Sequence, residues 1–173
     1  EKIRIYIESI PACFHDRIII HSHFHLVKEY GLKGAHFTKK YTYEDFLIES
    51  QLKAMDNPLK YVGFSVHSIY EIKQNSNLYD YLFLSPLFDS ISNVGYTSKF
   101  NLTKLKKFLV EEELTSEIIA LGGMNDTKVL KVMDLGFDGL SLLGYIWTEF
   151  DEDQDVVEAV KKFEIINSLS NTV

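Results

Sequence analysis

Short apolar runs of four to eight residues recur along the chain and alternate with segments of helical periodicity. Apolar residues fill these runs almost continuously instead of alternating with polar ones, which is typical of parallel strands that are covered on both faces. The runs are RIIIH at 17–21, GAHFT at 34–38, YVGFSV at 61–66, YDYLFL at 79–84, EIIALGG at 117–123 and FDGLSLLG at 137–144. The pattern therefore predicts six buried strands.

Helical signals occupy the segments between these runs. Ser68 and Glu71 have the spacing of a capping box at the start of a helix. Asn125 is placed to cap a later helix, and Gly136 is placed to end it. Apolar residues at spacings of three and four predict helices at 69–75, 102–113, 126–135 and 155–169, and one at the start of the chain through Ile3, Ile7 and Ile10.

Alternating strands and helices predict the α/β class, with a parallel sheet and helical crossovers. A complete (β/α)₈ TIM barrel takes about 200 residues or more, whereas this chain has 173 residues and six predicted strands. An open doubly wound sheet is the alternative, but RIIIHSHFH at 17–25 lacks the glycine-rich phosphate turn expected after its first strand. We expect residues 1–173 to form a single partial barrel domain that lacks the first two strands.

The composition narrows the classes of partner. The formal net charge is −7, and no block of lysine and arginine could follow a nucleic-acid backbone. Cys13 is the only cysteine, which rules out an intrachain disulfide, and no run of 18 apolar residues occurs. We expect a soluble, cytoplasmic protein with a small-molecule ligand and with neither nucleic acid nor membrane as partner. The sequence leaves open whether the protein forms a homo-oligomer.

Histidines gather at the predicted strand ends, the edge where a barrel holds its ligand. His21 and His23, two residues apart, would share one face of a strand, and with His36 and His67 they could converge on a zinc-like metal ion. No carboxylate accompanies them, and we expect His36 to be a hydrogen-bonded core residue instead. His67 shares a strand face with Ser65 just before a helix, where an imidazole can transfer a proton.

Glycines mark two other strand ends. Gly122 and Gly123 separate a buried run from a helix, and Gly144 follows Leu143 at the end of the last run. Backbone N–H groups without a Cβ nearby can form an anion site, and the last two strands of a barrel are its usual phosphate site. We predict phosphate binding at these four residues; the alternative is that the glycines only make tight turns.

Four motifs in this order resemble the thiamine phosphate synthase family, a transferase family of thiamine biosynthesis that includes related thiazole tautomerases. They are GFSVHS at 63–68, DYLFLSPLF at 80–88, ALGGMN at 120–125 and GFDGLSLLGYIW at 136–147. The resemblance implies a (β/α)₈ barrel in which this chain begins at the second helix. It also implies a thiazole phosphate ligand whose phosphate is held by backbone amides near Gly123, Leu143 and Gly144.

The chain departs from the synthase pattern at three positions. The resemblance implies two aspartates that bind Mg²⁺ and a lysine that faces the diphosphate of the second substrate. Ser22, Tyr41 and Asn93 stand at these positions. The neutral replacements favour tautomerase-like proton transfer, for which the resemblance assigns the acid and base role to His67.

The sequence thus predicts His67 as the catalytic residue. Its predicted binding residues are Ser65, Ser68, Ser85, Pro86, Gly122, Gly123, Leu143 and Gly144. We expect no cofactor and no metal, whereas a true synthase would require Mg²⁺. Three alternatives stay open: a thiamine phosphate synthase that releases pyrophosphate, a catalytically silent regulator that binds a thiazole or thiamine phosphate, and a histidine-cluster metallohydrolase.

Overall fold

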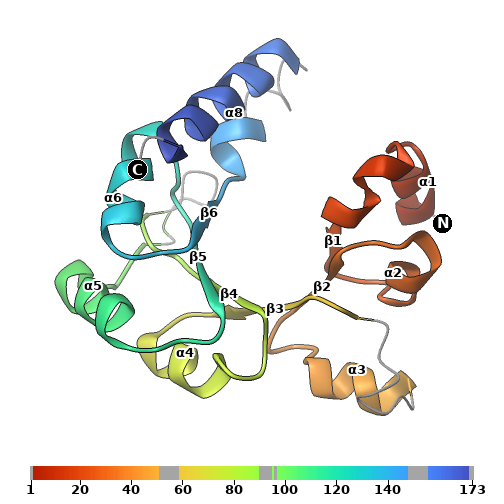
Figure 1. Ribbon diagram of the computed structural model, residues 1–173, viewed down its shortest axis with the longest axis horizontal. Coiled ribbons are helices and arrows are strands. Elements are labelled where there is room, and N and C mark those ends of the chain that lie inside the picture. The colour runs from red at the N-terminus through yellow and green to blue at the C-terminus, as the bar shows by residue number, and fades with distance from the viewer. Residues whose placement is uncertain (1, 51–58, 90–94, 96, 148–155, 172–173) are drawn as a thin grey trace. The chain divides into compact units, whose positions relative to one another are not determined.

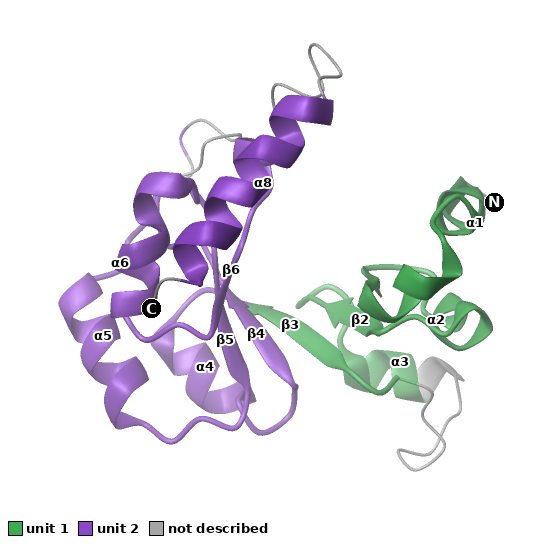
Figure 2. Cartoon of the chain, turned by 45° about the horizontal axis from the view of Figure 1, so that its top comes forward, with its two compact units in different colours: residues 1–65 green, residues 66–173 purple. Residues whose placement is uncertain are grey.

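The structure is a computed structural model, and it describes residues 2–50, 59–89, 95, 97–147 and 156–171 (Figure 1). Contacts between residues group the chain into two compact units, residues 1–65 and residues 66–173 (Figure 2). The strand β3 (Val62–Val66) crosses from the first unit into the second. The sequence prediction of a single domain stays a prediction.

Unit 1 contains parallel strands buried among short helices. β2 pairs in parallel with β1 and with β3, with Gly34 opposite Ile19 and Ala35 opposite Val62. All four residues of β2 are buried, as expected for a parallel strand covered on both faces. The elements are α1 (Lys2–Glu8), the 3₁₀ helix η1 (Ala12–Arg17), β1 (Ile19–Ile20), α2 (His25–Tyr30), β2 (Gly34–Phe37), α3 (Tyr43–Ser50) and most of β3.

Unit 2 repeats the strand and helix alternation. β5 pairs in parallel with β4 and β6, and α6 packs against both β6 and α8. The elements are α4 (Ile69–Asn75), β4 (Tyr81–Leu84), α5 (Leu102–Glu111), β5 (Glu117–Leu121), the 3₁₀ helix η3 (Asp126–Lys128), α6 (Val129–Asp134), β6 (Gly139–Ser141) and α8 (Val156–Ser170). Residues 144–147 are also helical. No helix among the described residues is long and apolar enough to cross a membrane.

The predicted strands and most predicted helix boundaries are confirmed. Each of the six apolar runs contains a strand, and α4 covers the predicted residues 69–75. The Ser68 hydroxyl accepts a hydrogen bond of 3.2 Å from the backbone N–H of Glu71, as a capping box requires. Asn125 does precede η3, but its side chain accepts from the Thr127 hydroxyl and makes no capping bond to the helix. Gly136 follows α6 with a φ of 89°.

The first strand is shorter than predicted. Arg17 still belongs to η1, and β1 ends at Ile20, so His21 is not in the strand. His23 also lies outside any strand and has a left-handed backbone, with a φ of 58°. The prediction that His21 and His23 share a strand face is therefore wrong, because the period of two on which it depends ends before either residue.

Candidate active site

His67 directly follows β3, and its ring is oriented by the end of the neighbouring strand. The backbone N–H of Ser85, the residue after β4, donates to the carbonyl of Val66, the last residue of β3, at 3.1 Å. The Ser85 carbonyl oxygen then lies 2.8 Å from Nδ1 of His67. Because a carbonyl only accepts, we assign the hydrogen of the neutral ring to Nδ1. Nε2 is left with a lone pair that can accept a proton.

The start of α4 holds the backbone of His67 in place. The backbone N–H of His67 donates to Oε2 of Glu71 at 2.9 Å, while Glu71 donates its own N–H to the Ser68 hydroxyl. These reciprocal bonds satisfy backbone donors that have no partner within the helix. The residues of the capping box therefore position the imidazole, and the Ser68 hydroxyl is engaged as a cap.

A cavity of about 600 Å³ in unit 2 contains the exposed ring of His67. This volume is in the usual range for small-molecule sites. The cavity brings together four of the predicted site residues, namely His67, Ser68, Ser85 and Pro86. Its other described lining residues are Ile69, Tyr70, Thr97, Lys99, Phe100, Asn101 and Lys104.

Lys99 and Lys104 are site residues that the sequence reasoning missed. Lys99 lies in the segment before α5, and Lys104 lies in the first turn of that helix, which Asn101 caps with a bond of 3.0 Å to the N–H of Lys104. The Asn101 cap, followed by an amphipathic helix, is the sequence signal that could have located this turn. Asn93, for which the family resemblance implies a lysine in the synthases, lies outside the described residues.

The glycine pair after β5 is required by close packing. Gly122 and Gly123 have φ values of 99° and 64°. A Cβ on Gly122 would lie 2.8 Å from Cα of Pro86, and one on Gly123 would lie 2.2 Å from the carbonyl oxygen of Asp89. Because neither glycine has a Cβ, residues 86–89, which follow β4, can pack directly against the turn after β5.

The other predicted phosphate residues lie after β6. Leu143 is 63% exposed, and Gly144 begins the helical residues 144–147. The described lining of the His67 cavity includes neither of them, nor Gly122, Gly123 or Ser65. Phosphate binding at these glycines and at Leu143 stays a prediction.

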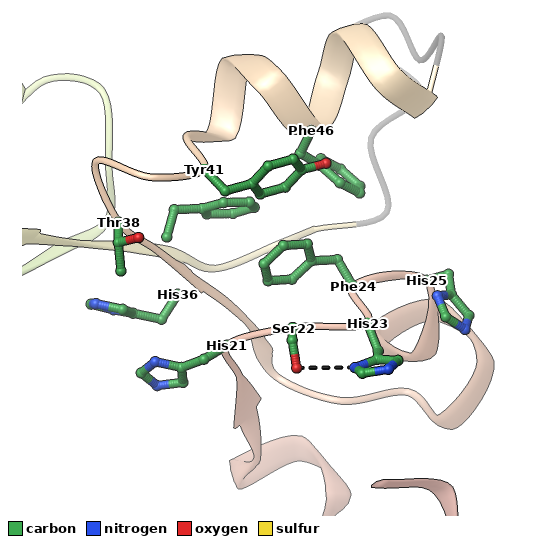
Figure 3. A pocket seen from close by; sticks show the side chains of 10 residues that line it. His21, Ser22, His23, Phe24, His25, His36, Thr38, Tyr41 and Phe46 are labelled. Atoms are coloured by element: carbon green, nitrogen blue, oxygen red, sulfur yellow. Dashed lines mark hydrogen bonds between the residues drawn. The ribbon is translucent and has the colours of Figure 1, made fainter. Parts of the chain in front are cut away.

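A second cavity, of about 530 Å³, lies within unit 1 and is rich in histidine and aromatic side chains (Figure 3). Its lining residues are His21, Ser22, His23, Phe24, His25, His36, Phe37, Thr38, Tyr41 and Phe46. The ring centroids of His21 and His36 lie 4.6 Å apart. The hydroxyl of Ser22 and Nδ1 of His23 form a hydrogen bond of 3.0 Å. Among the described residues, no group of three or more His, Cys, Asp or Glu side chains is arranged to hold a metal ion.

His36 is a buried, hydrogen-bonded histidine, as the sequence predicted. Its Nε2 lies 2.8 Å from the hydroxyl of Ser65, so the predicted site residue Ser65 has a partner within unit 1. Burial of the ring, with a smaller contribution from the charge of His21, lowers the pKa of His36 to about 3. The ring is therefore neutral at physiological pH.

Comparison with known proteins decides the family. A sequence model of the family described as "Thiamine monophosphate synthase" matches residues 7–146. The chain belongs to this family. A thiamine-phosphate synthase from Listeria monocytogenes is 26% identical over 163 residues, which cover 93% of this chain and 73% of that protein. One from Oceanobacillus iheyensis is 26% identical over 159 residues, covering 90% of this chain and 72% of that protein.

Solved structures of family members confirm the predicted fold class. A thiamine phosphate pyrophosphorylase from Bacteroides thetaiotaomicron superposes with a TM-score of 0.78 at 28% identity, covering 98% of this chain and 78% of that one. One from Pyrococcus furiosus has a TM-score of 0.61 at 18% identity, covering 87% and 67%, and supports the fold alone. The fold is therefore a partial barrel of the thiamine phosphate synthase type, with six parallel strands.

Proposed function

We propose that this family member is a thiamine-biosynthesis enzyme that binds a thiazole phosphate and acts as a thiazole tautomerase. The observation that carries the proposal is the His67 ring, whose Nδ1 lies 2.8 Å from the Ser85 carbonyl while the ring lines a cavity of about 600 Å³. Fixing the hydrogen on Nδ1 makes Nε2 the basic nitrogen before the ligand arrives. A general base that is preorganised in this way commonly contributes 10²- to 10⁴-fold to a rate.

The proposed reaction is an isomerisation in which protons and electrons balance. Nε2 of His67 removes a proton from a saturated carbon of the thiazole ring, and the electron pair of the broken C–H bond enters the ring. The imidazolium then returns the proton to the other end of the conjugated system, and the ring becomes aromatic. The reaction needs no oxidant, metal ion or second substrate.

The residues present do not fit the Mg²⁺ that a synthase would use. At the two positions that match the synthase aspartates, Ser22 offers a hydroxyl and Tyr41 a phenol. Both line the cavity of unit 1, whose described lining contains neither Asp nor Glu. Mg²⁺ strongly prefers carboxylate and phosphate oxygens. These neutral groups support proton transfer over synthesis.

Thiamine phosphate synthesis is the second candidate. It is supported by relatives that bear this name at 26% identity and by the two lysines in the His67 cavity, which could offset the charge of a diphosphate. A synthase joins a pyrimidine diphosphate to the thiazole phosphate and releases pyrophosphate. The two candidates therefore differ in their products.

An absorbance assay tests the proposal. We expect the full chain to convert the non-aromatic isomer of a thiazole phosphate into the aromatic isomer, with a change in ultraviolet absorbance as the ring becomes aromatic. The rate should be unchanged by EDTA, because no step uses a metal ion. Heat-denatured protein serves as the control. A rate no higher than that of the control, or one that EDTA abolishes, would contradict the proposal.

A further inference from the structure

The His67 cavity is positively charged in a chain that is negative overall. The formal net charge of the chain is −7, yet the described lining of this cavity contains Lys99 and Lys104 and neither Asp nor Glu. Both lysines are exposed. Two ammonium groups at one cavity favour an anion there, since opposite charges within a few ångströms attract even when solvent screens them.

Neighbouring lysines in unit 2 have carboxylate partners, whereas Lys99 and Lys104 have none among the described residues. On α5, Nζ of Lys106 lies 2.7 Å from Asp134, and Nζ of Lys107 lies 3.9 Å from Glu111. Within the part of the chain that the structure describes, the ammonium groups of Lys99 and Lys104 form no ion pair or hydrogen bond. Their charge is therefore available to a ligand.

We propose that Lys99 and Lys104 bind an anionic substituent, a phosphate or a carboxylate, on the ring that His67 deprotonates. This inference rests on the proposed function, since it names the group by which the substrate of that site is recognised. Tyr70, Phe100 and Pro86 also line the cavity and supply apolar surface for a planar ring. The ring then lies beside the imidazole, and its anionic group lies toward the start of α5.

Calorimetric titration of the full chain tests this assignment. The probes are hydroxyethylthiazole phosphate, a thiazole carboxylate without phosphate, and uncharged hydroxyethylthiazole. We expect the double variant Lys99→Gln/Lys104→Gln to raise Kd for at least one anionic probe by about tenfold or more, because two charge-assisted contacts are lost. Kd for the uncharged probe should be unchanged. Whichever anionic probe is weakened identifies the substituent.

A matched control is available on the same helix. Lys106→Gln/Lys107→Gln removes the same two charges away from the cavity, and we expect it to leave every Kd within about twofold, because screening weakens distant charges. The double variant Lys99→Arg/Lys104→Arg should restore most of the affinity. Equal Kd values in the Lys99→Gln/Lys104→Gln variant and the control, or failure of the wild type to bind either anionic probe, would overturn the inference.

The same experiment separates this inference from the proposed function. Binding that depends on Lys99 and Lys104 in a protein without isomerase turnover would support the anion site and refute the tautomerase. Turnover that persists with unchanged KM in the Lys99→Gln/Lys104→Gln variant would support the tautomerase and refute the anion site.

Discussion

Replacing His67 with Gln is expected to lower kcat of thiazole isomerisation by about 10²- to 10⁴-fold. Glutamine retains a side-chain amide that can donate to the Ser85 carbonyl, which accepts from Nδ1 of His67 at 2.8 Å. It has no group that can accept and return a proton near neutral pH. The loss should therefore appear in kcat, while the affinity for an anionic thiazole, set by other residues, should change little.

Steady-state kinetics of wild type and variant measure this effect. His25→Gln is the matched control, because His25 is an exposed histidine at the start of α2 in unit 1. The control should retain wild-type kcat. Isomerisation by His67→Gln at more than about a tenth of the wild-type kcat would show that another group transfers the proton.

Replacing Gly123 with Ala is expected to lower the free energy of unfolding by about 3 to 4 kcal/mol, from a left-handed backbone and a steric clash. Gly123 has a φ of 64°, and its added Cβ would lie 2.2 Å from the backbone oxygen of Asp89. A backbone atom cannot move away as the tip of a side chain can. In a domain of this size, the melting temperature should fall by roughly 8 to 12 °C.

Gly31→Ala separates the two contributions in a thermal melt. Gly31 has a nearly identical φ of 63°, but no heavy atom lies within 4 Å of its added Cβ. The free energy of unfolding of this control should fall only by the cost of a left-handed backbone at a residue with a Cβ, about 1 to 2 kcal/mol. Equal melting temperatures for the two variants would contradict the close packing of Gly123 on residues 86–89.

The sequence predicts the order of elements well because each strand carries its own local signal. Continuous apolar runs located all six strands, and the Ser68 and Glu71 pair located the start of α4 to the residue. The predicted end of the first strand was wrong. The run at 17–21 is mostly apolar, but β1 ends at Ile20, before His21. Apolar composition reports burial, and it does not report where strand pairing ends.

The candidate site was predicted only in part because its members come from separate elements. His67 and Ser85 could be chosen from the ends of two runs, but the bond that fixes the imidazole requires the two strands to be paired. Lys99 lies in the connection before α5 and Lys104 in the first turn of that helix, and neither helical periodicity nor capping shows that a lysine faces the same cavity as His67. The packing of Gly123 on Asp89 likewise depends on a contact between distant segments.

One incubation tests the central claim most directly, since it offers the chain both reactions at once. The wild-type protein is mixed with the pyrimidine diphosphate, the non-aromatic thiazole phosphate isomer and Mg²⁺, and the mixture is followed by ¹H and ³¹P NMR. We predict that aromatic thiazole phosphate accumulates and that no pyrophosphate signal appears, because Ser22 and Tyr41 stand where the family resemblance implies metal-binding aspartates in a synthase. Growth of a pyrophosphate signal, or failure of the aromatic thiazole phosphate to accumulate, would contradict the account.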